Sequence, residues 1–272
     1  MHAHRTGDWR QQYGPWAVVT GASDGIGRAF ALRIADRGVN VALAARRLDR
    51  LEELAHTIRN GAGVDARIIP VDLAEGDGIA VVQAMTRDLE VGLFVACAGF
   101  GTSGPFLKAS VERELEMLRV NCGAVLALTQ HFARASAARG RGGIILMSSI
   151  VAFQGVPGAA SYAATKAYVQ TLAEGLAREV APRGVDVVAC APGPVRSGFG
   201  ARADMQMSTA AIPETVVEPT LDALGKRVTV RPGALSMLLG GSLAATPRWL
   251  RVRILERVMG GMISHQRRAA HA

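Results

Sequence analysis

The 272-residue sequence is poor in the features that mark secreted, metal-binding and membrane-spanning proteins. It holds only three cysteines, Cys97, Cys122 and Cys190, and each lies in an apolar run, which indicates buried thiols and no disulfide framework or metal site. No run of about 18 apolar residues occurs, and residues 1–15 contain no apolar stretch as long as that of a signal peptide. These absences disfavour export and membrane spanning, so we expect a cytoplasmic protein.

Aromatic and acidic residues are also scarce. Phe, Trp and Tyr make up 5% of the chain, and 23 acidic residues stand against 31 basic ones, which gives a formal net charge of +8. The basic residues are mostly arginines spread along helical segments, with no lysine tract and no basic patch interleaved with aromatics that could stack bases. We therefore expect no nucleic acid partner, and we attribute the charge to solvated helix faces and a site for an anionic cofactor.

Apolar residues, by contrast, are numerous enough for one sizeable core. They make up 49% of the chain, and a length of 272 residues suits one α/β domain better than two. We expect a single domain over residues 1–272, with a core at about 15–231 and a C-terminal helical extension at 232–265.

Short apolar runs alternate with helical patterns through this core. Because the expected strands are apolar throughout and helices separate them, the pattern predicts a Rossmann-type, doubly wound, seven-stranded parallel sheet with helices on both faces. The expected strands are 16–20, 39–45, 66–71, 91–97, 143–148, 185–191 and 227–231, and the expected helices of the core are 28–37, 48–60, 75–89, 111–139 and 161–181.

Tyr162 and Lys166 are the pair that most directly indicates chemistry. They lie four residues apart in an Ala-rich, Pro-free segment, so a helix there places them on one face. A neighbouring ammonium favours the phenolate and should lower the pKa of the tyrosine toward the working range of an acid–base group. Ser148 and Ser149 follow a buried strand, at the edge where open α/β sheets bind ligands. The alternative reading of a lone Tyr-x-x-x-Lys pair is an ordinary solvated helix face.

A glycine-rich turn follows the first expected strand. The segment Gly21–Gly27 reads GASDGIG and leads into the helix expected from Arg28. Unpaired N–H groups at a helix start attract anions, and glycine lets a pyrophosphate approach the backbone. The turn therefore predicts a phosphate site, although its spacing is Gly-x-x-x-Gly-x-Gly and not Gly-x-Gly-x-x-Gly.

These motifs together resemble the short-chain dehydrogenase/reductase family over about residues 15–200. The residues that carry the resemblance are TGASDGIG from Thr20, then Asn121, Ser149, Tyr162 and Lys166, and PGPVRS from Pro192. The resemblance implies that Tyr162 donates and accepts the proton and that Ser149 orients and polarises the substrate carbonyl. It further implies that Lys166 lowers the pKa of the tyrosine and holds the nicotinamide ribose, and that Asn121 holds a water in a proton relay.

The second expected strand ends in Ala44-Ala45-Arg46-Arg47, with no acidic residue. In dinucleotide folds an acid at this point binds the ribose 2′-hydroxyl, whereas arginine accommodates a 2′-phosphate. Two guanidiniums that can each pair with a dianionic phosphate favour NADP(H) over NAD(H). Asp24 in the glycine turn argues against this preference for NADP(H). The alternative interpretation of the two arginines is that they merely begin a solvated helix.

The resemblance extends the cofactor site beyond the arginines. Asp72 and Leu73 resemble the family's adenine-contacting pair, and Val195 and Ser197 would contact the carboxamide. No metal is expected. The complete predicted cofactor-binding set is Gly21, Ser23, Asp24, Gly25, Ile26, Gly27, Arg46, Arg47, Asp72, Leu73, Ala98, Gly99, Asn121, Tyr162, Lys166, Pro192, Gly193, Val195 and Ser197.

One segment departs from the family's pattern. Ala96-Cys97-Ala98-Gly99 stands where the family usually has Asn-Asn-Ala-Gly. How this wall of the expected cofactor site is braced without the two asparagines is therefore in doubt. This departure raises an alternative function, a non-catalytic NADP-binding sensor or scaffold. The presence of Asn121, Ser149, Tyr162 and Lys166 argues against it, because a mere binder has no need of all four.

The expected activity is hydride transfer between NADP(H) and a carbonyl or secondary alcohol, in the direction of a ketoreductase. Residues 198–213 fall where the family has a substrate lid, and their Met and small apolar residues favour an apolar ketone or 3-oxo lipid. Phe153, Val156 and Pro157 would line the same pocket.

The C-terminal extension contains two further expected helices, 233–245 and 247–263. The second is amphipathic and basic, which fits packing over the substrate cleft or a partner subunit, or alternatively peripheral contact with an anionic membrane. Apolar residues on the outer side of the helix at 161–181 indicate a homo-oligomer, a dimer or a tetramer.

Overall fold

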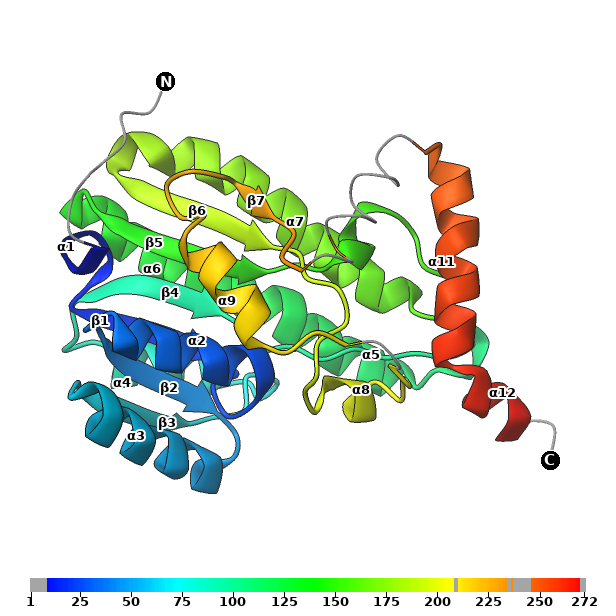
Figure 1. Ribbon diagram of the computed structural model, residues 1–272, viewed down its shortest axis with the longest axis horizontal. Coiled ribbons are helices and arrows are strands. Elements are labelled where there is room, and N and C mark those ends of the chain that lie inside the picture. Colours follow the sequence, from blue (N-terminus) through cyan, green and yellow to red (C-terminus); the bar gives the residue numbers. More distant parts are fainter. Residues whose placement is uncertain (1–8, 208–209, 234–235, 237–245, 270–272) are drawn as a thin grey trace.

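The computed structural model describes residues 9–207, 210–233, 236 and 246–269, and these form a parallel sheet of seven strands between two layers of helices (Figure 1). The strand order is β3-β2-β1-β4-β5-β6-β7, so the chain reverses direction across the sheet between β1 and β4. The predicted doubly wound sheet is confirmed. The strands are β1 (Trp16–Thr20), β2 (Asn40–Ala45), β3 (Ala66–Pro70), β4 (Val91–Ala96), β5 (Gly142–Met147), β6 (Val185–Cys190) and β7 (Thr229–Val230).

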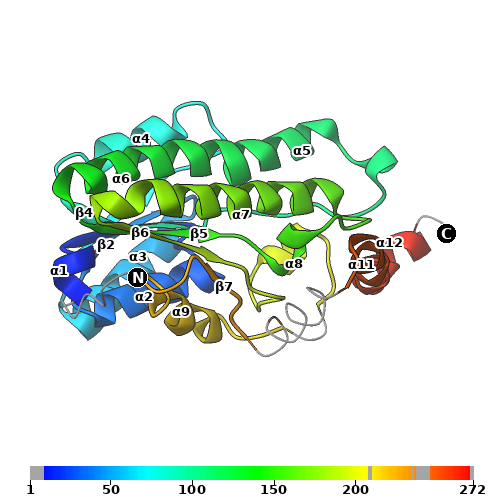
Figure 2. The ribbon, with the colours of Figure 1, turned by 90° about the horizontal axis from the view of Figure 1, so that it is seen from above.

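The two helical layers cover opposite faces of the sheet (Figure 2). Successive residues of a strand point to opposite faces, so the buried Val18 belongs to one apolar cluster and the buried Val19 to the other. One layer holds α1 (Trp9–Tyr13), α2 (Gly25–Asp36), α3 (Leu48–Ala62) and α9 (Glu214–Leu221), and the other holds α4 (Gly78–Met85), α5 (Val111–Leu118), α6 (Val125–Arg139) and α7 (Ala160–Val180).

The long helix expected over 111–139 is interrupted. A π-helical segment, Arg119–Ala124, lies between α5 and α6, and it contains the buried Asn121. Short π segments inside α-helices occur frequently at functional sites. The helix expected over 75–89 is also shorter than predicted, because α4 is limited to Gly78–Met85.

Helix α1 was not expected from the sequence. Its Tyr13 donates a hydrogen bond from its hydroxyl to Asp186 (2.8 Å), and the Trp9 ring lies under the Arg37 guanidinium at 5.0 Å. Gly143 leaves room for the Tyr13 ring, because a Cβ at that position would lie 2.8 Å from the ring. The packed core therefore begins before residue 15.

The C-terminal helices lie beyond the carboxyl ends of the strands, where α11 stands across the end of the sheet (Figures 1 and 2). Helix α11 (Arg248–Met262) confirms the helix expected over 247–263, and α12 (Ser264–Ala269) follows it. The helix expected over 233–245 lies almost wholly outside the described residues. Strand β7 is shorter than expected, and β6 reaches it through hydrogen bonds from Ala189 to Val228 and from Ala191 to Val230.

None of the described helices combines the length and the hydropathy that a membrane span requires. Among the described residues, the remaining short helices are α8 (Phe199–Arg202) and three 3₁₀ turns, Phe106–Lys108, Ile150–Phe153 and Ala181–Arg183.

Candidate active site

A cavity of about 1150 Å³ opens at the carboxyl ends of the central strands. Every residue of the predicted catalytic and cofactor-binding sets lines it except Asn121, which lies behind its wall. The loops after β1, β2, β3, β4, β5 and β6 all contribute to the lining. The sheet topology therefore brings together groups that lie up to 176 residues apart in sequence, from Gly21 to Ser197.

The glycine turn has the shape that the sequence predicted. Gly21 adopts a left-handed conformation (φ +68°), and a Cβ there would lie 2.8 Å from the Ala98 nitrogen. A Cβ on Gly27 would lie 2.2 Å from the Gly21 carbonyl oxygen, so only glycine lets the start of α2 pack against the turn. Asp24 caps α2 by accepting a hydrogen bond from Gly25 N (2.7 Å). The start of this helix faces the cavity.

Arg46 and Arg47 follow β2 and are each half exposed. The Arg46 guanidinium lies 3.5 Å from Asp72, and that of Arg47 lies 3.5 Å from Asp24 and 3.2 Å from the Ser23 hydroxyl. Together with the glycine turn, these groups form a cradle of cationic and N–H donors that fits the phosphates of a dinucleotide. Strands β1 and β4 lie between β2, which carries the arginines, and β5, which leads to Ser149.

Tyr162 and Lys166 lie on α7 with side chains that are almost fully buried. The Lys166 Nζ donates a hydrogen bond to the Met147 carbonyl (2.8 Å) and lies 5.9 Å from the centre of the Tyr162 ring. Burial lowers the pKa of Lys166 to about 8. Burial also raises the pKa of Tyr162 to about 12, and a hydrogen bond with Ser149 acts in the opposite direction.

A lowered pKa of Tyr162 is therefore not found in this structure, and the effect that we assigned to Lys166 stays a prediction. The cost of burying a phenolate exceeds the effect of its neighbours.

The two serines after β5 have different partners. Ser149 caps the 3₁₀ turn Ile150–Phe153 by accepting from Val151 N (3.4 Å), and it reaches Tyr162. Ser148 instead donates to the Lys166 carbonyl (3.3 Å), which holds the strand end against α7. This division supports the choice of Ser149 as the group that meets a substrate.

The side-chain amide of Asn121 forms its hydrogen bonds with other residues of the protein. Its Nδ2 donates to the Phe100 carbonyl (2.8 Å) and to the Thr165 hydroxyl (3.1 Å), and its Oδ1 accepts from Phe100 N (3.1 Å). A Cβ on Gly99 would lie 3.0 Å from this Oδ1 and 3.6 Å from the Lys166 Nζ. Asn121 thus braces the segment after β4 against α7.

Thr20 braces the other side of the same segment, the one that carries Cys97 where the family has asparagine. Its hydroxyl accepts from Ala98 N (3.1 Å) and donates to the Val95 carbonyl (3.4 Å). Cys97 and Cys122 are only partly buried, in contrast to our expectation, whereas Cys190 is buried. Although Cys97 as a residue is partly exposed, desolvation of its thiol group raises the pKa of that thiol.

The segment PGPVRS lies over the cavity between two supports. The Pro192 carbonyl accepts from Ile150 N (3.1 Å), and Gly193 N donates to the Ser236 hydroxyl (2.7 Å). Val195 forms a bridge with Ala211, which fixes the start of the lid region.

The cavity also has apolar lining residues outside the predicted catalytic and cofactor-binding sets, some of them in the expected lid at 198–213. They come from the segment after β4, the π segment, the 3₁₀ turn after β5, the lid and α11. They are Phe100, Val120, Ile150, Val151, Phe199, Met205, Met207, Leu255, Val258, Met259 and Met262. The helical spacing of the α11 residues was visible in the sequence, which left the substrate cleft, a partner subunit and a membrane surface open as the surface that they meet.

Of the three pocket residues expected between the serines and Tyr162, only Val156 lines the cavity. Phe153 instead lies under the Arg231 guanidinium at 4.3 Å, so the expectations for Phe153 and Pro157 are wrong.

Comparison with known proteins connects this geometry to a family. Residues 15–207 match the family model described as short chain dehydrogenase. A 7β-hydroxysteroid dehydrogenase of Clostridium sardiniense is 34% identical over 233 residues, which cover 84% of this chain and 89% of that protein.

Solved structures similar to this one include the following two. A structure from a study of 7β-hydroxysteroid dehydrogenase stereoselectivity has a TM-score of 0.85 and 27% identity, and the match covers 92% of this chain and 99% of that one. A short-chain dehydrogenase of Sphingobium yanoikuyae in complex with NADPH has a TM-score of 0.77 and 28% identity, and the match covers 86% and 97% of the two chains.

Proposed function

The chain belongs to the short-chain dehydrogenase family and is an NAD(P)-dependent oxidoreductase of carbonyl or alcohol groups, and we propose that it reduces a bulky apolar ketone with NADPH. One observation carries the proposal. A single cavity joins two arginines suited to a 2′-phosphate, a buried Tyr–Ser–Lys group, and an apolar chamber walled by the C-terminal helix.

The preference for NADPH is supported by the cradle after β2. Arg46 and Arg47 provide two guanidiniums beside the glycine turn, and no carboxylate follows the strand directly to bind a 2′-hydroxyl. The proposed holding residues are those of the predicted cofactor-binding set, with Lys166 directed at the nicotinamide ribose. When bound, the nicotinamide supplies the hydride that a ketone accepts.

The proton comes from Tyr162 in this proposal. Because its pKa is raised to about 12, the phenol is protonated at neutral pH and can donate to the carbonyl oxygen. Ser149 lies beside the phenol and would donate a hydrogen bond to the oxygen as negative charge develops there. Lys166 remains cationic below pH of about 8, which favours the tyrosinate left after the transfer.

The apolar chamber supports a substrate with a rigid or extended hydrocarbon body. Met205, Leu255, Met259 and Met262 line the chamber, and methionine adapts its shape to large apolar ligands. The similarity to a protein named 7β-hydroxysteroid dehydrogenase favours a steroid-sized ketone over a linear 3-oxo chain.

Helix α11 supports this substrate by forming part of the cleft wall. Its buried residues Leu255 and Met259 belong to the same apolar cluster as Tyr162, whereas Trp249, Arg253 and Arg257 are exposed. Since its apolar side faces the cavity, packing over the cleft explains the helix better than peripheral attachment to an anionic membrane. Flotation with anionic vesicles at low and high salt separates the two, because a cleft wall leaves the protein unbound.

A homo-oligomer is supported by exposed apolar residues on the α5–α7 face. Leu115 is 47%, Leu118 42% and Leu126 46% exposed at helical spacing, and Tyr168 on α7 is 37% exposed. Such a stripe is suited to a second copy of the chain and to a dimer. We expect Leu118→Glu to reduce the mass measured by light scattering to that of a monomer, whereas an unchanged mass would exclude this face.

The deciding experiment is a fluorescence titration with NADPH and NADH, followed by turnover of steroid and 3-oxoacyl ketones. Tighter binding of NADPH and turnover that Tyr162→Phe abolishes without loss of binding are the expected results. Binding of neither nucleotide would refute the proposal, and turnover retained by Tyr162→Phe would refute the assigned proton donor.

A further inference from the structure

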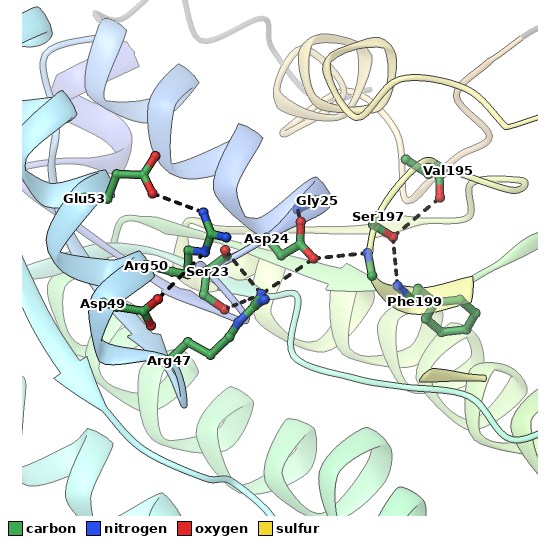
Figure 3. A network of polar contacts seen from close by, with 11 residues as sticks. Ser23, Asp24, Gly25, Arg47, Asp49, Arg50, Glu53, Val195, Ser197 and Phe199 are labelled. Carbon is green, nitrogen blue, oxygen red and sulfur yellow. Dashed lines mark hydrogen bonds and ion pairs between the residues drawn. The ribbon is translucent and has the colours of Figure 1, made fainter. Parts of the chain in front are cut away.

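The Asp24 carboxylate joins three segments at the mouth of the cofactor site (Figure 3). Its Oδ1 accepts a hydrogen bond from Gly25 N (2.7 Å), and its Oδ2 accepts from Gly198 N (3.0 Å). The same Oδ2 lies 3.5 Å from the Arg47 Nη2. One side chain therefore contacts the glycine turn, the first residue before the lid helix α8 and an arginine expected to hold the 2′-phosphate.

The contact with Arg47 bears on the choice of nucleotide. Arg47 and Asp24 have side chains that are 50% and 46% exposed, so both can be reached by a ligand from the cavity. A carboxylate 3.5 Å from the guanidinium offsets part of its charge and repels a dianionic phosphate that approaches it. Arg47 also donates to the Ser23 hydroxyl (3.2 Å), which holds the guanidinium at the turn.

The contact with Gly198 bears on the lid. A Cβ on Gly198 would lie 2.8 Å from the Asp24 Oδ2, and a Cβ on Gly25 would lie 2.6 Å from the Ser197 Cβ. The two glycines thus let the segment before α8 lie directly on the glycine turn. The Ser197 hydroxyl in turn accepts a hydrogen bond from Phe199 N (3.3 Å), which connects the segment on the glycine turn to the first residue of α8.

We propose that Asp24 is a positioning residue with two separable roles. Its charge restrains the preference for NADPH over NADH by competing with the 2′-phosphate for Arg47, and its oxygen atoms hold the start of the lid on the glycine turn. The inference rests on the proposed function, because it presupposes that the cavity binds a nicotinamide nucleotide.

The charge is tested by Asp24→Asn, which keeps an oxygen to accept from Gly25 or Gly198 and removes the negative charge. We expect NADPH to bind about fivefold tighter, the scale of a partly exposed ion pair, with little change for NADH. Asp49→Asn is the matched control, because Asp49 lies in the first turn of α3, pairs with Arg50 at 3.9 Å and does not line the cavity. It should leave the ratio of the two dissociation constants unchanged.

The route through Arg47 is tested by a double-mutant cycle. Arg47→Gln should weaken the binding of NADPH, and adding Asp24→Asn to this variant should not strengthen that binding. An equal effect of Asp24→Asn and Asp49→Asn, or a gain that persists without Arg47, would overturn the charge role.

The lid role is tested by comparing Asp24→Ala with Asp24→Asn. The alanine variant loses both acceptor oxygens whereas the asparagine variant keeps one, so alanine should raise the KM for the ketone several-fold and more than asparagine does, and equal KM values would overturn this role. Thermal unfolding verifies that each variant is folded. A wild-type protein that binds neither nucleotide would refute the proposed function itself, whereas normal binding with an unmoved ratio refutes the inference alone.

Discussion

Replacing Asn121 by alanine is the substitution whose effect the structure defines best. The side chain is 1% exposed and makes three hydrogen bonds, two with the main chain of Phe100 and one with the Thr165 hydroxyl. A buried hydrogen bond contributes about 1 kcal/mol, and a main-chain group left without a partner costs at least as much. The loss of all three should lower the free energy of unfolding by about 3 kcal/mol.

Activity should fall together with stability in this variant. Asn121 and Lys166 both face Gly99, since a Cβ on Gly99 would be 3.0 Å from Asn121 Oδ1 and 3.6 Å from the Lys166 Nζ. Without the brace, the wall of the cofactor site can move relative to α7, so kcat should fall and NADPH binding should weaken. A residue that merely holds a relay water would lower kcat and leave stability and binding unchanged.

Urea unfolding and nucleotide titration of the same protein samples distinguish these roles. Thr129→Val is the control from α6, because the Thr129 hydroxyl is buried and has no hydrogen-bond partner among the described residues. Its free energy of unfolding should stay the same or rise by up to about 1 kcal/mol. A loss below about 1 kcal/mol in Asn121→Ala, with kcat still reduced, would refute the bracing role.

Three further predictions follow from the site. Leu255→Ala should cost about 2 kcal/mol of transition-state stabilisation, or roughly thirtyfold in kcat/KM, for bulky apolar ketones and little for acetone-sized ones; equal losses for both would contradict the wall assigned to α11. Because burial lowers the pKa of Lys166 from 10.5 to about 8, the unfolded chain holds this proton longer, so the free energy of unfolding should rise with pH between those values. Denaturant titrations across that pH range measure this rise, and the free energy of unfolding of Lys166→Met should not show it. Thr20→Val removes the acceptor of Ala98 N and should lower the free energy of unfolding by about 1–2 kcal/mol and weaken NADPH binding; an unchanged unfolding midpoint would exclude the brace.

Much of the fold and the site could be predicted because the deciding signals are local. A strand that is buried on both faces must be apolar throughout, so the runs before Gly21, Arg46 and Ser149 identify strands whose ends meet at one edge of the sheet. Tyr162 and Lys166 lie one helical turn apart whatever surrounds them. Apart from Asn121, the predicted site residues accordingly line one cavity. Their individual roles, the single-domain organisation and the preference for NADPH stay predictions.

Other features depend on contacts between distant parts of the chain. The π segment at Asn121 accompanies bonds to Phe100 and Thr165, which are 21 and 44 residues away in sequence. The pKa of Tyr162 rises because burial outweighs its neighbours, and the degree of burial is set by several packed elements together.

The sequence by itself thus determined the parallel sheet, the glycine turn and the placement of Tyr162 and Lys166 one helical turn apart, since each follows from spacing within one strand or helix. Only the tertiary structure decided what helix α11 covers and which lid residue Asp24 holds. Amphipathicity states that α11 has an apolar side but not which surface meets it, and the hydrogen bond from Gly198 to Asp24 joins residues 174 positions apart. Such contacts exist only once the sheet has brought both loops to the same edge.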